Sequence, residues 1–205
     1  MSTKWLEWAQ RIQALSQSGL AFTKDVYDKE RYEELREISA DIMSEYTGLE
    51  MKKVKELFTN ETGYQTPKVD VRGAVFRDGD ILLVREKVDD RWSLPGGFSD
   101  IGLSPSENIV KEIKEESGFD VIHKKLIALL DTQHHEHPPL PYHYYKLFIH
   151  CEIVGGEATT GMETRDVQFF PEHALPELSA GRNTEKQMHM LFDYMRHPEQ
   201  ETIFD

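Results

Sequence analysis

Apolar residues recur every three or four positions through the N-terminal part of the chain, a spacing that predicts amphipathic helices. One stripe begins at Trp5 and reaches a candidate stop at Gly19, a second ends near Gly48, and a short third covers residues 51–58. Each of these helices has a single apolar face, which must pack against another helix, the next domain or a second subunit. We therefore expect a small helical domain over residues 1–62 that serves as an accessory or dimerisation module.

An alternation of apolar and polar residues begins at Val69 and predicts a half-buried strand, followed by a hairpin turn at Asp78 and Gly79. Further strands are expected at 81–84, 125–130, 144–153 and 167–170, with a turn at Gly155 and Gly156 and a last helix at 184–196. Only one strong helix, near residues 105–117, lies among these strands. The pattern therefore favours an α+β sandwich over repeated βαβ units, in a second domain that spans residues 67–205.

Composition and charge exclude several classes of protein. The 205-residue chain is 39% hydrophobic, which is enough for a packed core, and no apolar run approaches the ~18–20 residues of a membrane span. The net charge of −13 argues against broad binding to polyanions, so that contact with phosphates requires a bridging cation. The single cysteine, Cys151, excludes an intrachain disulfide. With charges at its N-terminus in place of a secretion signal, the sequence predicts a cytoplasmic protein that does not bind membranes.

Residues 105–117 carry the start and stop signals of a well-defined helix. Ser104 can cap its N-terminus, Pro105 suits the first helical position, and Glu107 completes a capping box. Gly118 suits the position after the helix, where a left-handed backbone is favoured. We therefore expect this helix to have firm ends and fixed faces.

Three glutamates project from one side of this helix. Glu112, Glu115 and Glu116 are spaced i, i+3 and i+4, and like charges at this spacing repel by roughly 0.2–0.5 kcal/mol per pair. A divalent cation removes this conflict, because Mg²⁺ prefers oxygen ligands and keeps waters and substrate phosphates in its other positions. Just upstream, Gly96 and Gly97 let the backbone approach a ligand closely, where a free carbonyl can add another oxygen. The pattern predicts a carboxylate helix facing a glycine turn, with room for a polyphosphate and its metals.

The segment from Gly97 to Phe119 resembles the Nudix box of the Nudix hydrolase family. The box is Gly, five residues, Glu, seven residues, then Arg-Glu-apolar-x-Glu-Glu-x-Gly-apolar, and this chain matches its second half in register. Two positions depart from it: Leu103 stands at the first glutamate, and Lys111 stands at the arginine. Lysine keeps the charge but loses the bidentate fork that would orient a neighbouring glutamate. Glu107, one turn before Lys111, is a candidate substitute for the missing carboxylate.

The resemblance covers roughly residues 69–170 and implies an α/β/α sandwich with a mixed sheet. It also implies hydrolysis of a nucleoside diphosphate linked to another moiety, with Mg²⁺ or Mn²⁺ as the cofactor. The helical domain before the box makes the chain similar to a two-domain bacterial group that includes the CDP-choline pyrophosphatases and is dimeric. We therefore expect a homodimer that acts on a small nucleoside diphosphate derivative.

The resemblance also implies roles for individual residues. Glu112 and Glu116 would be the primary metal ligands, Glu115 an additional ligand and the carbonyl of Gly96 a backbone ligand. The general base is open among Glu116, Glu112 and a glutamate of a late loop, for which Glu163 is the candidate. With Lys111, these carboxylates form the expected catalytic set.

The substrate pocket has its own candidates. The histidine-rich run at 134–137 lacks the His-Glu-x-x-His spacing of a zinc site and is followed by prolines, so it favours a loop that rims the pocket. Histidines there can donate hydrogen bonds to phosphate. Candidates for stacking on a base are Phe98, Trp92, Tyr142 and Tyr144. Substrate contacts are therefore expected from Gly96, Gly97, Phe98 and His134.

Several functions are compatible with this site. CDP-choline is the single substrate that the resemblance favours, while hydrolysis of ADP-ribose or a nucleotide sugar differs only in pocket residues. A catalytically silent domain that senses a nucleotide is suggested by Leu103 and opposed by the three intact glutamates. Trimming of RNA ends as a 3′–5′ exonuclease, also associated with the group, is disfavoured by the net charge, although a local basic patch would escape that average.

Overall fold

The structure is a computed structural model in which residues 4–47, 63–138 and 143–205 are described. The chain divides into two compact units, one with the N-terminal helices and one comprising Lys68–Pro138 and Tyr144–Asp205. The short helix expected at 51–58 lies outside the described residues.

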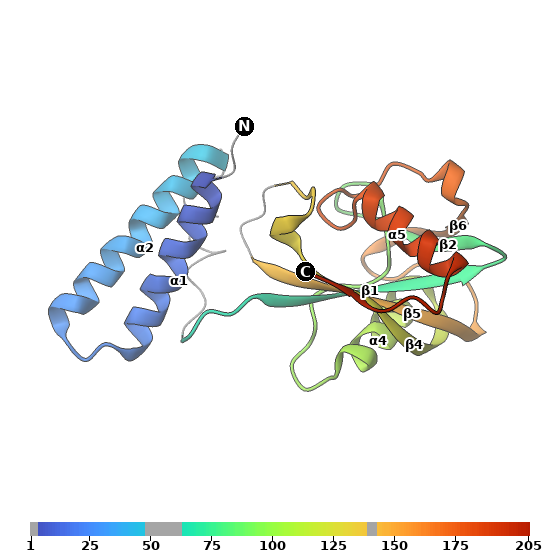
Figure 1. Ribbon diagram of the computed structural model, residues 1–205, viewed down its shortest axis with the longest axis horizontal. Coiled ribbons are helices and arrows are strands. Elements are labelled where there is room, and N and C mark those ends of the chain that lie inside the picture. Colours follow the sequence, from blue (N-terminus) through green and yellow to red (C-terminus); the bar gives the residue numbers. More distant parts are fainter. Residues whose placement is uncertain (1–3, 48–62, 139–142) are drawn as a thin grey trace. The chain divides into compact units, whose positions relative to one another are not determined.

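The first unit contains two helices that lie side by side, α1 (Lys4–Phe22) and α2 (Val26–Thr47) (Figure 1). Between them, the Ser39 hydroxyl donates a 2.7 Å hydrogen bond to the carbonyl of Ala9. The expected stop at Gly19 is wrong, because α1 continues to Phe22. Gly19 instead makes room for the ring of Tyr32, since a Cβ at this position would lie 2.4 Å from that ring.

The second unit is built on a mixed sheet with one helix on each face (Figure 1). The strands are β1 (Lys68–Arg77), β2 (Asp80–Glu86), β3 (Trp92–Ser93), β4 (Phe119–Asp131), β5 (Tyr144–Gly156), β6 (Thr164–Phe170) and β7 (Ile203–Phe204). The helices are α4 (Pro105–Ser117) and α5 (Glu185–Arg196), with short 3₁₀ turns η1 (Thr132–His134) and η2 (Glu172–Ala174). The strand order is β3-β2-β1-β5-β4-β7, with β6 paired to β2; β1/β5 and β4/β7 are parallel. The predicted α+β fold with a mixed sheet is confirmed.

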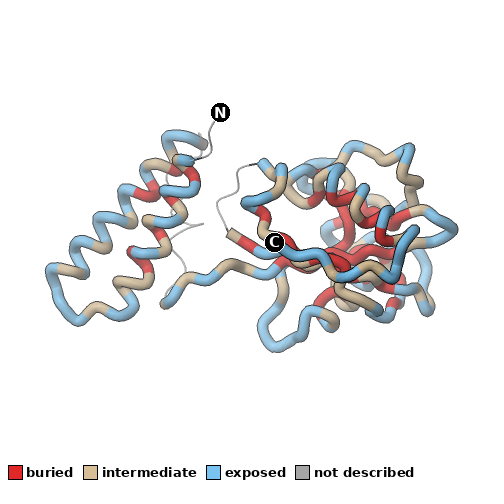
Figure 2. The backbone as a smooth tube through the Cα atoms, viewed as in Figure 1, coloured by how far each residue is buried: buried red, intermediate tan, exposed pale blue. Residues whose placement is uncertain are grey.

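Each face of the sheet has its own apolar core. The buried stretches of this unit gather along the central strands of the sheet (Figure 2). On β1, Val71 and Val75 face α4 and pack with Ile109 and Ile113. The alternate position Ala74 belongs to the core under α5. Alternation along one central strand therefore supplies both sides of the sandwich.

Of the two turns predicted from the sequence, the structure contains one and lacks the other. Asp78 and Gly79 have φ values of 54° and 90° and close the β1–β2 hairpin, as predicted. The turn expected at Gly155 and Gly156 is wrong, because both residues pair with the start of β4 and end β5. Only glycine fits at position 156, because its φ is positive at 77° and a Cβ would lie 2.4 Å from the Gly118 carbonyl oxygen. No helix in the described part of the chain is long and apolar enough to span a membrane.

Candidate active site

The glycine turn lies along the N-terminal half of β1. Strand β2 pairs with β1 only near the hairpin, and the turn occupies the edge that β2 leaves free. The amide of Val71 donates to the Gly97 carbonyl and the amide of Gly73 to the Pro95 carbonyl, each at 2.9 Å. The central strand of the sheet therefore fixes the position of the turn.

The two glycines of the turn differ in how strictly the structure requires them. Gly96 has a φ of 138°, and a Cβ there would lie 2.0 Å from the carbonyl oxygen of Val71. A Cβ on Gly97 would meet Glu112, at 3.6 Å from its Oε2. The first glycine thus lets the turn pack on β1, whereas a side chain at the second would lie in ordinary contact with the carboxylate of Glu112.

Helix α4 starts and ends as the sequence predicts. The amide of Glu107 donates to Ser104 Oγ, and Glu107 Oε2 accepts from the Ser104 amide at 2.8 Å; Gly118 follows the helix with a φ of 78°. The hydrogen bonds from Ser104 lower the pKa of Glu107. The carboxylate of Glu107 is therefore engaged in capping, and the structure gives no support to its replacing the glutamate absent at Leu103.

Two of the three glutamates face the turn. Glu116 is only 8% exposed, and its Oε2 accepts a 2.8 Å hydrogen bond from the amide of Gly96. Burial raises the pKa of Glu116 to about 8, against the attraction of Arg72 and the hydrogen bond from Gly96. Burial also raises the pKa of Glu112, an effect that the charges of Lys111 and Arg72 partly oppose. These two carboxylates are therefore held in a partly dry environment beside the glycine turn, where their charges repel each other.

The third glutamate has a different surrounding. Glu115 Oε2 lies 3.0 Å from Lys111 Nζ, which also lies 3.2 Å from Asp100 Oδ2. These hydrogen bonds raise the pKa of Lys111 above its ordinary value. Across the described residues, no three His, Cys, Asp or Glu side chains form a group that could hold a metal ion. The structure thus brings Glu112 and Glu116 to the turn, while ligation by Glu115 stays a prediction.

A buried charged network lies beside these carboxylates and was not predicted. Arg72 is paired in a bidentate manner with Asp70, at 3.0 Å and 2.8 Å, and donates to the Leu94 carbonyl at 3.1 Å. Lys146, with no exposed surface, lies 3.8 Å from Asp70, and its burial lowers its pKa to about 7. Asp70 and Arg72 occupy the polar positions of an alternating strand, which predicts a solvent face. The alternation is correct, but this end of β1 is covered.

Glu163, the candidate base, lies exposed in the loop before β6. Its carbonyl accepts from the amide of Lys87, and the next residue, Thr164, donates to the main-chain carbonyl of Glu116 at 2.8 Å. The loop is therefore tied to the C-terminal end of α4. The catalytic role of the Glu163 carboxylate stays a prediction.

The histidines of the run at 134–137 differ in their exposure and in their contacts. His134 is exposed, and its neighbour His135 pairs with Asp205 at 3.1 Å. His137 instead contacts Gln187, with 3.0 Å between His137 Nε2 and Gln187 Nε2, and burial lowers the pKa of His137 to about 4. Lys146 and Asp70 of the buried network both act on the charge of His137, which therefore lies near that network.

Of the aromatic candidates, Phe98 and Tyr144 lie together, with ring centroids 5.6 Å apart in an edge-to-face arrangement. Trp92 packs on Phe170 at 4.7 Å, and Tyr142 lies outside the described residues. Phe98 is half exposed as a whole residue.

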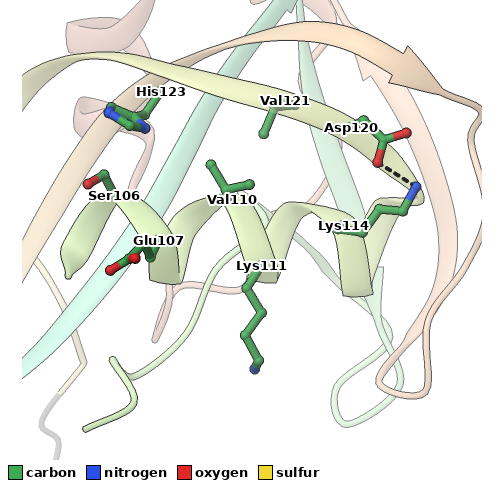
Figure 3. Close-up of a pocket in the computed structure, with 8 residues that line it drawn as sticks. All are labelled: Ser106, Glu107, Val110, Lys111, Lys114, Asp120, Val121 and His123. Carbon is green, nitrogen blue, oxygen red and sulfur yellow. Dashed lines mark ion pairs between the residues drawn. The ribbon is translucent and has the colours of Figure 1, made fainter. Parts of the chain in front are cut away.

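A separate groove of about 420 Å³ lies between α4 and β4 (Figure 3). Val110 and Val121 point toward each other across it, and Lys114 pairs with Asp120 at one end at 2.8 Å. Its lining includes Lys111 but none of the three glutamates. This groove therefore lies on a different flank of α4 from the candidate site.

The geometry of a capped carboxylate helix facing a glycine turn has a counterpart among known families. The family model for the NUDIX domain matches residues 66–192, and a model described as a UDP-X-like, N-terminal oligomerisation domain matches residues 3–58. The chain belongs to the Nudix family and is a two-domain Nudix pyrophosphohydrolase, which confirms the resemblance of its box.

Individual relatives add detail. The chain is 60% identical over 205 residues to Bacillus subtilis YjhB, provisionally named an ADP-ribose pyrophosphatase, and the match covers 100% of this chain and 99% of that protein. A crystal structure of a UDP-X diphosphatase is 35% identical, with a TM-score of 0.65, over 99% of this chain and 98% of the other. An ADP-ribose pyrophosphatase structure from Streptococcus suis is 41% identical, with a TM-score of 0.62, over 68% of this chain and all of the other.

Proposed function

We propose that this protein hydrolyses the pyrophosphate bond of a nucleoside diphosphate linked to another moiety, at the site formed by Glu112, Glu116 and the Gly96–Gly97 turn. The observation that carries the proposal is the convergence of a buried carboxylate, Glu116, and a half-buried one, Glu112, on a backbone turn whose Gly96 has no room for a side chain. In a purely structural role these charges would destabilise the fold, because burial disfavours their ionised forms.

The residues at the turn fit a divalent cation. Carboxylate and carbonyl oxygens are the ligands that Mg²⁺ and Mn²⁺ prefer, and the absence of a Cβ on Gly97 leaves space next to Glu112 Oε2. Glu112, Glu116 and the carbonyl of Gly96 would hold the ion, with Glu115 as an additional ligand if it leaves Lys111. When bound, such an ion lowers the pKa of a coordinated water and neutralises phosphate charge.

The surrounding residues have supporting roles in this proposal. Arg72 lies close enough to both carboxylates to lower the pKa of each, and so favours their ionised forms. Phe98 offers a half-exposed ring beside the turn for a base or sugar. The base that accepts the proton of the attacking water is one of Glu112, Glu116 and Glu163.

The names of the relatives favour ADP-ribose or another nucleoside diphosphate sugar as the substrate. CDP-choline, which the box and the helical domain suggested, has no counterpart in those names and is retained as a further member of the test panel. The N-terminal match to an oligomerisation domain supports a homodimer.

The test is product analysis with ADP-ribose, a UDP-sugar, CDP-choline and a 5′-labelled RNA, each with Mg²⁺, with Mn²⁺ and with chelator. We expect a mononucleotide and the phosphorylated second moiety from at least one of the first three, only with metal. Cleavage that persists in chelator, or release of nucleotides from the RNA alone, would contradict the proposal. Tight binding of a nucleotide without cleavage under either metal would instead support a silent sensing domain.

A further inference from the structure

We propose that Asn183 is a positioning residue that holds the glycine turn in register with Glu112 and Glu116. This inference rests on the proposed function of the turn as part of a metal site. Asn183 lies at the entrance to α5, 89 positions from the residue that it contacts, and no motif in the sequence singles it out.

The peptide groups on the two sides of Leu94 are held by different side chains. Asn183 Oδ1 accepts a 2.9 Å hydrogen bond from the Leu94 amide, and Arg72 Nη1 donates to the Leu94 carbonyl at 3.1 Å. Leu94 is buried and lies two residues before Gly96, whose amide contacts Glu116. A shift at Leu94 therefore changes where the backbone of Gly96 lies relative to the carboxylates.

Asn183 itself is firmly anchored. The segment before it runs beside β3, where the Ser179 amide donates to the Trp92 carbonyl at 2.8 Å. The Asn183 amide donates to the Ser179 carbonyl, and the adjacent Arg182 pairs with Glu86 at 2.8 Å. The side chain of Asn183 can therefore transmit the position of this segment to the turn.

The other end of the Asn183 side chain gives a second reason for a functional role. Asn183 has no exposed surface, and its Nδ2 has no hydrogen-bond partner in the described structure. The Leu94 amide requires the oxygen on its side, so the amide group cannot turn over to satisfy Nδ2. A buried unsatisfied donor destabilises the fold. The hydrogen bond that Asn183 Oδ1 accepts from the Leu94 amide gives a reason for asparagine at this position despite that loss of stability.

The experiment compares Asn183→Ala with Asn183→Asp and Ser179→Ala in the full-length protein. Aspartate keeps an oxygen at the Leu94 amide and removes the unsatisfied Nδ2 donor. Ser179→Ala is the matched control, because it removes a partly buried 2.6 Å hydrogen bond to Asp89 from the same segment without touching Leu94. Binding of Mn²⁺ is measured by electron paramagnetic resonance, alongside kcat and KM and the thermal midpoint Tm.

We expect Asn183→Ala to weaken Mn²⁺ binding about 10-fold or more and to lower kcat by a similar factor, with a smaller change in KM, as expected for loss of a group that orients a ligand. Asn183→Asp should stay within about 3-fold of wild type, and Ser179→Ala should lower Tm without weakening Mn²⁺ binding. If Asn183→Ala does not fold, Asn183→Ser, whose hydroxyl is too short to reach Leu94, should show the same loss of affinity.

Two outcomes would overturn the inference. Mn²⁺ affinity unchanged in the alanine and serine variants, or lost equally in Ser179→Ala, would show that Asn183 has only a structural role. Wild-type protein that binds no Mn²⁺ would instead overturn the metal site and with it the proposed function, so the two failures are distinguishable.

Discussion

At the scale of single residues, the three glutamates on one side of α4 differ in their surroundings, although their spacing in the sequence does not distinguish them. Glu115 is paired with Lys111 on the outer side of α4, whereas Glu116 is buried and bound to the amide of Gly96. The i, i+3, i+4 spacing predicts a shared side of the helix, but it does not say which carboxylates the rest of the chain covers. That information comes from Gly96 and Arg72, which belong to other elements.

Replacing Glu116 with glutamine is expected to abolish hydrolysis while the fold stays intact, because it removes a charged ligand without changing volume. Activity is measured with Mg²⁺ on the best substrate of the panel, and folding by circular dichroism. Glu152→Gln, at an exposed glutamate of β5 that pairs with Lys124, is the control and should keep wild-type activity. Near wild-type turnover in Glu116→Gln would falsify its assignment as a ligand.

The pH dependence of stability offers an independent test of the burial of Glu116. Its pKa of about 8 in the folded protein is above the ordinary 4.5, so its contribution to stability is fully present below pH 4.5 and is lost as the pH rises through about 8. Glutamine does not ionise, so the Glu116→Gln variant does not lose stability in this way as the pH rises. The stability of Glu116→Gln relative to wild type should therefore rise between pH 5 and pH 8, by on the order of 2–4 kcal/mol.

This difference is measured by urea unfolding of both metal-free proteins at several pH values. Parallel curves for the two proteins would show that Glu116 is exposed in solution, contrary to its 8% exposure in the structure.

At the scale of elements, the sequence predicts features set by neighbouring residues well, but it predicts poorly which residues are buried by distant segments of the chain. The ends of α4 follow from Ser104 and Gly118, and the β1–β2 hairpin from Asp78 and Gly79, because each involves contacts within a few residues. The burial of Arg72 depends on segments far along the chain. Alternation therefore gives the two faces of β1 but not the solvent exposure of each face.

The glycine turn is an element whose shape is set by one residue. Gly96→Ala should destabilise the protein by about 3 kcal/mol or more, because it combines a positive φ with a Cβ only 2.0 Å from the Val71 carbonyl oxygen. Gly79→Ala is the control: it also has a positive φ, but no atom lies within 4 Å of its Cβ, so it should cost about 1–2 kcal/mol. Equal losses in chemical denaturation would show that the turn does not pack against β1 as described.

At the scale of the whole molecule, the chain combines a catalytic unit with a helical pair that leaves apolar side chains uncovered. Trp8 and Leu15 of α1 are 62% and 52% exposed and lie two turns apart on one helix face. The sequence predicts such a face from its single stripe, but not which surface covers it. The match to an oligomerisation domain supports a second copy of the chain.

We expect the full-length protein to have twice the chain mass of 23.8 kDa by light scattering coupled to size exclusion. Replacing Trp8 and Leu15 together by glutamate should shift it toward the monomer, because charge at an apolar contact opposes association. Val88→Glu, at an exposed position of the other unit, should leave the mass unchanged. A monomeric wild-type protein, or a double variant that stays dimeric, would rule out this face as the interface.

The most direct test of the account is anomalous diffraction from crystals of the protein soaked in Mn²⁺. We expect a manganese peak in contact with the carboxylates of Glu112 and Glu116 and with the Gly96 carbonyl. A manganese peak bound elsewhere would contradict the assignment of this site. So would manganese at full occupancy in a crystal in which both carboxylates keep their metal-free contacts.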